Sequence, residues 1–532
     1  MGMKTFPVLH DLGGGRTIWT HTFDTFYTKV YVPAEDPFSG MINFGFKAPY
    51  FLVFEEQRMS EKEAVAFAES CGLASLAQQY ATSVVFVYPT ASGGWPAATV
   101  EMFQKLISES KIHQYYNHGA VTFKDRFTKQ WGDCFIRGAI FRTFLFGFGS
   151  SADYIATHLM TAINGEYLWG PGDITPTAVI LQNLSVVPDI GRNDIPVMSV
   201  GNSEKINNIL KSKCQDVIIR DTPDYINDLR DSFLRYKRWC GSLEKEVSMS
   251  ELHMIEKPGV VTVHTSGDNC GDYAGTEEHP VGYVAYCRDD LSDLQSLPTL
   301  LVFHGGGDSA FYISEVSGWY RVACRHRFLL IAVEDHMNTT ASETVELIEL
   351  LKKEYPIDPH RIYASGFSMG GCKCWDLYQE YPLIFAALAP MDATFDVGLN
   401  VYGKPAPTPI NHCTPVPLYY AAGEATPLPE LPCQARKCWD RMRYVFEVNR
   451  IEHEYSADFD RQSEWPDPLW GESGDIIEKS FDDSRQSILT EHHFRSADGV
   501  YRTVFSGISG QGHECREHTC EHAWRFIARF TR

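Results

Sequence analysis

Three short stretches of the sequence hold residue types that together can cleave an ester or amide bond. GFSMG (366–370) fits the pattern G-x-S-x-G, in which a serine sits on a sharp strand-to-helix turn. HGGG (304–307) supplies glycines that let backbone N–H groups approach a developing oxyanion. GQGHE (510–514) places a histidine near the end of the chain. Because a serine hydroxyl is a good nucleophile only when a base takes its proton, this set of residues predicts a serine hydrolase.

The order of the stretches assigns the roles, because the usual order around such a turn is serine, acid, histidine. Ser368 is predicted to be the nucleophile, and His513 the general base and acid. The backbone N–H groups of Gly305, Gly306 and Met369 are predicted to form the oxyanion hole.

Alternating strands and helices are expected to position these residues. In the second half of the chain, strands are predicted at 297–307, 328–335, 357–371 (with the serine turn at its end), 385–393, 416–424 and within 501–514 before His513. Helices are predicted between them at 314–327, 341–355 and 372–382. Continuous apolar strands between helices are typical of a mostly parallel sheet that is covered on both faces.

The stretches HGGG, IDPHRIYASGFSMGGCKCWDLYQEYPLIFAALAP and GQGHE resemble the α/β-hydrolases of the polyhydroxybutyrate depolymerase and feruloyl esterase group. The resemblance covers roughly residues 258–532 and is most specific between 357 and 390. It implies a carboxylic ester hydrolase that works through an acyl-serine on a small-molecule or oligomeric ester, without a cofactor. The position of His513 also matches the pattern of this family.

The acid is where the sequence departs from the family. The usual position, three residues after the glycine that ends the preceding strand, holds Thr426, which cannot serve. Glu430 is preferred because two prolines stiffen the turn that presents it. Glu424 on the same loop and Asp392 after the previous strand remain as alternatives.

The first half of the chain repeats the same pattern in a degenerate form. GFGSSA (147–152) resembles GFSMGG (366–371), but Gly149 replaces the serine. EEQ (55–57) stands where the second half has HGG, and no histidine occurs between His158 and His253. Three independent losses indicate a domain without this chemistry.

We therefore expect two tandem α/β-hydrolase-like domains, each with a mostly parallel sheet flanked by helices. Residues 1–245 are predicted to form a catalytically inactive domain, and residues 246–532 the catalytic domain. An acidic insertion near 452–490 is interpreted as a solvated surface segment, or as a cap whose Trp465 and Trp470 face the substrate. The first domain is expected to pack against the active domain, shape its pocket, form a homo-oligomer or hold another ligand.

The net charge and the composition of the chain limit the classes of molecule that it is expected to bind. The 532 residues carry a formal charge of −21, which repels nucleic acid and anionic membranes, so neither is an expected partner. No apolar run is long enough to span a membrane, and no signal peptide is recognisable at the N-terminus. The fourteen cysteines are interpreted as reduced thiols of a cytoplasmic protein.

Three other functions remain open from the sequence. A serine peptidase or acyltransferase would use the same triad. A non-catalytic binding or scaffold protein is suggested by the threonine at position 426. A metal-dependent hydrolase could use HECREHTCEH (513–522), but its spacing is not H-E-x-x-H, so no metal is expected and His518 and His522 are interpreted as surface residues of a helix start.

Overall fold

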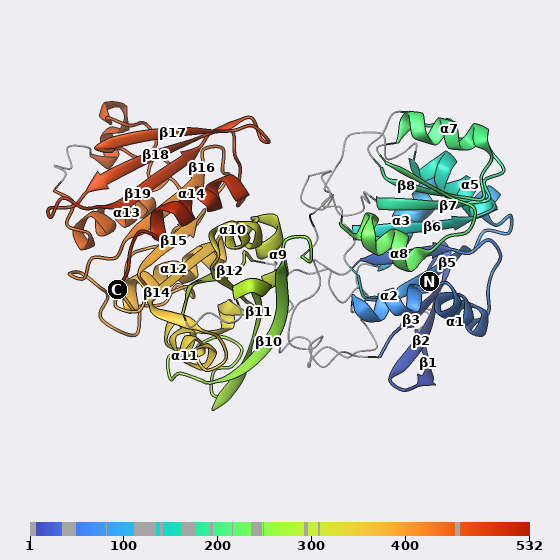
Figure 1. The fold of residues 1–532 in the computed structure, drawn as a ribbon, viewed down its shortest axis with the longest axis horizontal. Coiled ribbons are helices and arrows are strands. Elements are labelled where there is room, and N and C mark those ends of the chain that lie inside the picture. The colour runs from blue at the N-terminus through green and yellow to red at the C-terminus, as the bar shows by residue number, and fades with distance from the viewer. Residues whose placement is uncertain are drawn as a thin grey trace. The chain divides into compact units, whose positions relative to one another are not determined.

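The computed structural model describes residues 7–34, 49–80, 82–110, 135–138, 142–160, 176–191, 195–214, 216–235, 247, 249–291, 296–306, 309–452 and 458–532. The chain divides into two compact units, Met1–Ser248 and Met249–Arg532. The sequence placed this division at 245/246, three residues away. Figure 1 labels most of the elements of both units.

The second unit is built on a ten-stranded sheet. Its strands from one edge to the other are β10 (Met254–His264), β11 (Glu278–Arg288), β13 (Leu329–Val333), β12 (Leu297–Phe303), β14 (Ile357–Phe367), β15 (Ala387–Met391), β16 (Leu418–Gly423), β19 (Tyr501–Ile508), β18 (Ser487–Arg495) and β17 (Ile476–Asp482). The strands from β13 to β19 are parallel, and antiparallel strands lie at both edges. Parallel strands end at the same side of a sheet, so the loops after β12, β14, β15, β16 and β19 meet there.

The first unit has a nine-stranded sheet of closely related topology. Its strands in order are β1 (Val8–Gly13), β2 (Arg16–Thr22), β3 (Phe26–Val32), β5 (Val84–Pro89), β4 (Tyr50–Phe54), β6 (Thr143–Phe148), β7 (Pro176–Gln182), β8 (Val197–Val200) and β9 (Val217–Arg220). If the strands are renumbered in chain order with β2 as strand 1 of the first sheet and β10 as strand 1 of the second, both sheets contain the spatial order 1-2-4-3-5-6-7. In each sheet one more parallel strand follows, β9 in the first and β19 in the second. The fold class predicted from the sequence is therefore confirmed for both halves.

Helices cover both faces of each sheet. In the second unit, α9 (Ala310–Val316), α10 (Trp319–His326) and α14 (Glu517–Ile527) lie on one face, and α11 (Ala341–Leu351), α12 (Met369–Glu380) and α13 (Arg436–Val448) on the other. In the first unit, α1 (Glu61–Ser70), α2 (Leu73–Gln79) and α8 (Tyr225–Asp231) pack on one face, and α3 (Val100–Ser110), α5 (Ser150–Tyr154) and α7 (Glu204–Lys213) on the other. This layering buries the apolar strands that the sequence shows.

The segment after β4 forms two short helices. Residues 66–80 are not one continuous helix, because α1 ends at Ser70 and α2 begins at Leu73. Gly72 between them has a φ of 84°, a left-handed conformation that an α-helix cannot contain. The break therefore lies at this glycine.

The acidic insertion adds strands to the sheet instead of forming a separate cap. Its described part contains a short helical turn, η11 (Phe459–Glu464), and the hairpin β17–β18, which pairs onto β19 (Figure 1). Trp465 is stacked on Trp439 with 4.7 Å between ring centroids, and Trp470 is buried against Tyr420 and Phe505. The cap interpretation is therefore wrong for these two tryptophans, since both belong to the packed interior. No helix within the described ranges is long and apolar enough to cross a membrane.

Candidate active site

Ser368 is the single residue between the end of strand β14 and the start of helix α12, and its backbone conformation is strained. Its φ of 54° and ψ of −119° are unusual for a residue with a side chain. The flanking glycines make this turn sterically possible. A Cβ on Gly366 would collide with the backbone of Gly370, and one on Gly370 would collide with the carbonyl group of Phe303. The pattern G-x-S-x-G is therefore required by close backbone contacts.

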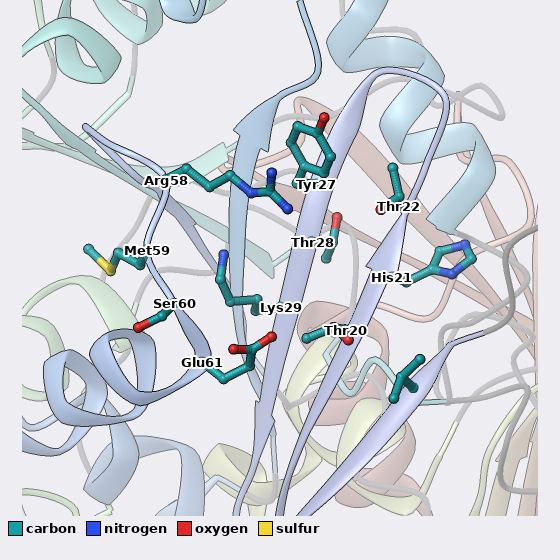
Figure 2. A pocket seen from close by; sticks show the side chains of 11 residues that line it. Thr20, His21, Thr22, Tyr27, Thr28, Lys29, Arg58, Met59, Ser60 and Glu61 are labelled. Carbon is teal, nitrogen blue, oxygen red and sulfur yellow. The ribbon is translucent and has the colours of Figure 1, made fainter.

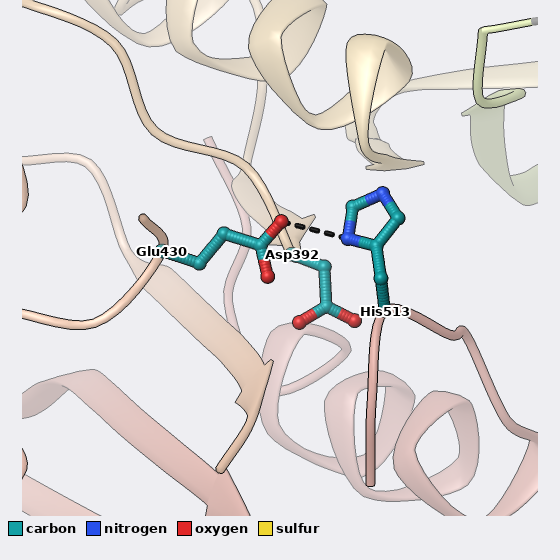
Figure 3. Close-up of side chains that lie close together, drawn as sticks. All are labelled: Asp392, Glu430 and His513. Atoms are coloured by element: carbon teal, nitrogen blue, oxygen red, sulfur yellow. Dashed lines mark ion pairs between the residues drawn. The ribbon is translucent and has the colours of Figure 1, made fainter. Parts of the chain in front are cut away.

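His513 follows β19 on a loop that returns to this turn. Its Nε2 lies 2.9 Å from Ser368 Oγ, within hydrogen-bond distance for taking the hydroxyl proton. Its Nδ1 lies 2.7 Å from Glu430 Oε1 (Figure 3). This second contact is an ion pair by distance, although the ring is not aligned for a good hydrogen bond. The structure thus brings Ser368, His513 and Glu430 into one chain of contacts.

Glu430 is buried and held by neighbours that the sequence did not identify. Thr426 Oγ1 donates a hydrogen bond to Glu430 Oε2 over 2.6 Å, and Gln434 Oε1 accepts one from the backbone N–H of Glu430 over 2.9 Å. Thr426 occupies the usual position of the acid, and it donates a hydrogen bond to Glu430, the carboxylate that takes the place of that acid. Its hydroxyl is the signal that could have pointed to a neighbouring acid.

Asp392 lies beside Glu430 and completes a buried pair of carboxyl groups (Figure 3). Its Oδ1 accepts a hydrogen bond from the backbone N–H of Gly423 over 2.8 Å. Burial, and then the charge of Glu430, raise the pKa of Asp392 well above its ordinary value. This shift favours the protonated form of Asp392, and Glu430 is the member of the pair whose oxygen faces His513 Nδ1.

Glu424 lies apart from these three residues. Its backbone N–H donates to the carbonyl group of Ile508, and its carboxylate lies against Gly507. Burial, and then the charge of Asp467, raise its pKa. Among the described residues, no hydrogen bond or ion pair joins Glu424 to His513. The geometry thus favours Glu430 over Glu424 as the acid.

The predicted oxyanion-hole residues come from two neighbouring segments. Met369 is the first residue of α12, and Gly305 and Gly306 follow β12. A Cβ on Gly306 would collide with the Met369 side chain, which shows how closely the two segments approach. His304 before them is buried, with Nδ1 2.8 Å from the carbonyl oxygen of Gly305. Gly307, the last glycine of the motif, lies outside the described residues.

The corresponding turn of the first unit keeps the shape but not the chemistry. Gly149 has a φ of 52° and a ψ of −119°, within a few degrees of Ser368. A Cβ on Gly149 would collide with the carboxylate of Glu56, so this side chain fills the place of a nucleophile. Glu55 next to it is buried and paired with Lys29, with 2.7 Å between Oε1 and Nζ.

A cavity of about 640 Å³ lies elsewhere in the first unit, between β2, β3 and the start of α1 (Figure 2). Tyr27, Thr28 and Lys29 line it from β3, and Arg58 lies over the ring of Tyr27, 3.7 Å from its centroid. Its lining includes neither Gly149 nor Glu56. The cavity is therefore separate from the degenerate turn.

No family model matches the chain. A bifunctional acetylxylan esterase/xylanase of Neocallimastix patriciarum is 32% identical over 127 residues, which cover 22% of this chain and 18% of that protein. The chain thus matches about a fifth of the length of this curated relative.

Solved structures of esterases also align with the chain. An acetyl xylan esterase from Aspergillus awamori is 12% identical with a TM-score of 0.31, covering 51% of this chain and 98% of that one. An S-formylglutathione hydrolase from Agrobacterium tumefaciens is 9% identical with a TM-score of 0.32, covering 51% and 95%. A ferulic acid esterase is 13% identical with a TM-score of 0.26, covering 36% and 87%.

Proposed function

We propose that the second unit is a serine esterase that hydrolyses carboxylic esters through an acyl-serine intermediate. The observation that carries this proposal is the chain of contacts from Ser368 Oγ through His513 to Glu430. A serine, an imidazole and a buried carboxylate in this order form a nucleophile, its base and the group that orients the base.

In the proposed reaction, Ser368 Oγ attacks the ester carbonyl carbon while His513 Nε2 takes the hydroxyl proton. Glu430 stabilises the imidazolium that forms. The backbone N–H groups of Met369 and of Gly305 or Gly306 bind the oxyanion of the tetrahedral intermediate. His513 then gives the proton to the leaving alcohol, and a water molecule activated by the same imidazole releases the acid.

The proposal also accounts for the threonine at position 426. A scaffold function was open from the sequence because this position lacks an acid. Glu430 supplies a carboxylate four residues later, and Thr426 donates a hydrogen bond to it. This arrangement supports a working triad and leaves the scaffold alternative without its main argument.

We propose short acyl and feruloyl esters as the first substrates to test, because the names of the similar proteins mention acetylxylan and ferulic acid. The first unit is proposed to be non-catalytic, since Gly149 carries no nucleophile and Glu56 occupies the space above it.

Labelling with a fluorophosphonate probe tests the proposal directly. We expect one adduct on the wild-type chain, mapped to Ser368 by peptide mass spectrometry, and none on Ser368→Ala. Hydrolysis of aryl acetates and methyl ferulate should disappear in the same variant. A folded wild-type protein that forms no adduct would show that the triad is not functional.

A further inference from the structure

Strand hairpin β17–β18 and helix α14 bring together histidines and carboxylates that the proposed reaction does not use. Glu491 and His493 are two residues apart on β18, so their side chains point to the same face. Glu478 on β17 is paired in register with Glu491. His518 and His522 are one turn apart on α14 and lie next to this face, which corrects their interpretation as simple surface residues.

A chain of hydrogen bonds fixes the carboxylate of Glu491. His522 Nδ1 lies 3.1 Å from Glu491 Oε2, and its Nε2 lies 3.0 Å from Ser480 Oγ. His518 Nε2 lies 2.6 Å from the same hydroxyl oxygen. One hydroxyl group can donate to one ring and accept from the other, so the whole chain is satisfied. The carboxylate of Glu491 is therefore held in place from one side by the helix.

Three groups converge on the other side of Glu491. One ligand atom each from Glu478, Glu491 and His493 lie within 4.8 Å of one another. His493 Nε2 is buried and has no hydrogen-bond partner among the described residues, while Glu478 Oε2 lies 3.7 Å away. A buried nitrogen of this kind costs free energy unless something binds to it.

We propose that Glu478, Glu491 and His493 bind a divalent transition-metal ion of the zinc type, with Glu491 oriented by His522. One imidazole and two carboxylates are ligands that Zn²⁺ accepts, with water in the fourth position, whereas Ca²⁺ and Mg²⁺ prefer oxygen ligands alone. A hydrogen bond from a neighbouring group to a ligating carboxylate is a regular feature of such sites.

The distances between the three ligand atoms are somewhat longer than in a metal-bound site, so the side chains must move together when the ion binds. Ligand atoms about 2.1 Å from a tetrahedral ion lie roughly 3.4 Å from one another. The three ligand atoms lie within 4.8 Å of one another, and His493 Nε2 is already 3.7 Å from Glu478 Oε2, so the groups must approach by at most about 1.4 Å. The Glu478 side chain is 64% exposed and free to make this movement, while Glu491 and His493 are fixed in the sheet. A bound ion would link both strands of the hairpin and, through His522, the middle of α14. This helix begins four residues after His513 in the sequence.

The test is metal binding by the full-length chain, first stripped with a chelator and then transferred to metal-free buffer. Zn²⁺ affinity is measured by competition with a chromogenic chelator, and Co²⁺ is added to record the visible absorption of a tetrahedral site. We expect one equivalent of Zn²⁺ in the wild type and at least about tenfold weaker binding in Glu478→Gln and in His493→Asn. Glu478→Gln changes an exposed side chain, so it tests the site without endangering the fold.

His264→Asn is the matched control, because His264 is an exposed histidine beside Glu346 and Glu278, at a site outside the cluster. Its Zn²⁺ affinity should equal that of the wild type. The proposal is overturned if the wild type binds no Zn²⁺ at micromolar concentrations, or if Glu478→Gln and His493→Asn both bind it as the wild type does. It is also overturned if Zn²⁺ blocks labelling of Ser368 and binds Glu478→Gln unchanged, because the ion would then lie at Asp392, Glu430 and His513.

Discussion

The hydroxyl group of Thr426 donates a hydrogen bond to Glu430 over 2.6 Å, on the oxygen that does not face His513. The residue at the usual position of the acid is thus a partner of the acid. This relationship separates the roles of the three candidate carboxylates, and each role can be tested by a conservative substitution.

Replacing Glu430 by glutamine should lower kcat/KM for an aryl acetate by about a thousandfold or more, because the charge that stabilises the imidazolium is lost. Glu424→Gln is the matched control on the same loop and should stay within about twofold of the wild type. Steady-state hydrolysis with both purified variants distinguishes the two residues. Equal losses in both variants would contradict the assignment of Glu430.

Thr426→Val should keep the fold and lower kcat by roughly tenfold, because a hydrogen bond to a charged carboxylate is worth about 1.5–3 kcal/mol. Thr426→Ser keeps the hydroxyl group and should retain most of the activity. The measurement is kcat and KM for the three proteins on one ester, with the loss expected in kcat. A valine variant as active as the serine variant would mean that the hydrogen bond does not matter for catalysis.

Asp392→Asn should remain active, because the raised pKa favours the protonated form of Asp392 and its amide analogue can still accept from the backbone N–H of Gly423. The wild-type residue also makes stability depend on pH. Since burial raises its pKa in the folded state, its contribution is full below the ordinary aspartate pKa and decreases as pH rises above it.

The free energy of unfolding in urea should therefore fall less between pH 5 and pH 8 for Asp392→Asn than for the wild type. Loss of activity in this variant, comparable to that of Glu430→Gln, would instead identify Asp392 as the acid.

Gly149→Ser should not produce a second labelled serine, and it should destabilise the first unit. A side chain at this position collides with Glu56 and adopts a positive φ, which together cost on the order of 1–3 kcal/mol. The double variant Gly149→Ser/Glu56→Ala should recover part of the lost stability. Thermal unfolding of the two single variants and the double variant measures this coupling. Additive effects would show that Glu56 does not fill the turn.

The sequence was sufficient for the fold class and for the residues with a strong local pattern. Ser368 could be placed because close backbone contacts at Gly366 and Gly370 leave a motif in the sequence. His513 could be placed because it follows the last strand of a recognisable alternation. These features depend on residues that are near one another in the chain.

Features that depend on how the loops fold could not be predicted from the sequence. Three carboxylates were compatible with the sequence, and only the turn between Thr426 and Glu430 shows which one reaches His513. Trp465 and Trp470 were expected on a surface insertion, but stacking on Trp439 and contacts with Tyr420 and Phe505 bury them. Burial of this kind comes from segments far apart in the chain, which periodicity does not report.

Gly149 and Ser368 have the same backbone conformation, but this conformation costs free energy of folding only at the serine. A serine in a left-handed conformation costs about 1 kcal/mol or more that a glycine does not, because only glycine lacks a Cβ. The second unit bears this cost, and its turn places the Ser368 hydroxyl group next to His513 Nε2. The first unit has the same turn with a glycine, so it has this topology without the strain and can hold stabilising contacts that a reactive turn excludes.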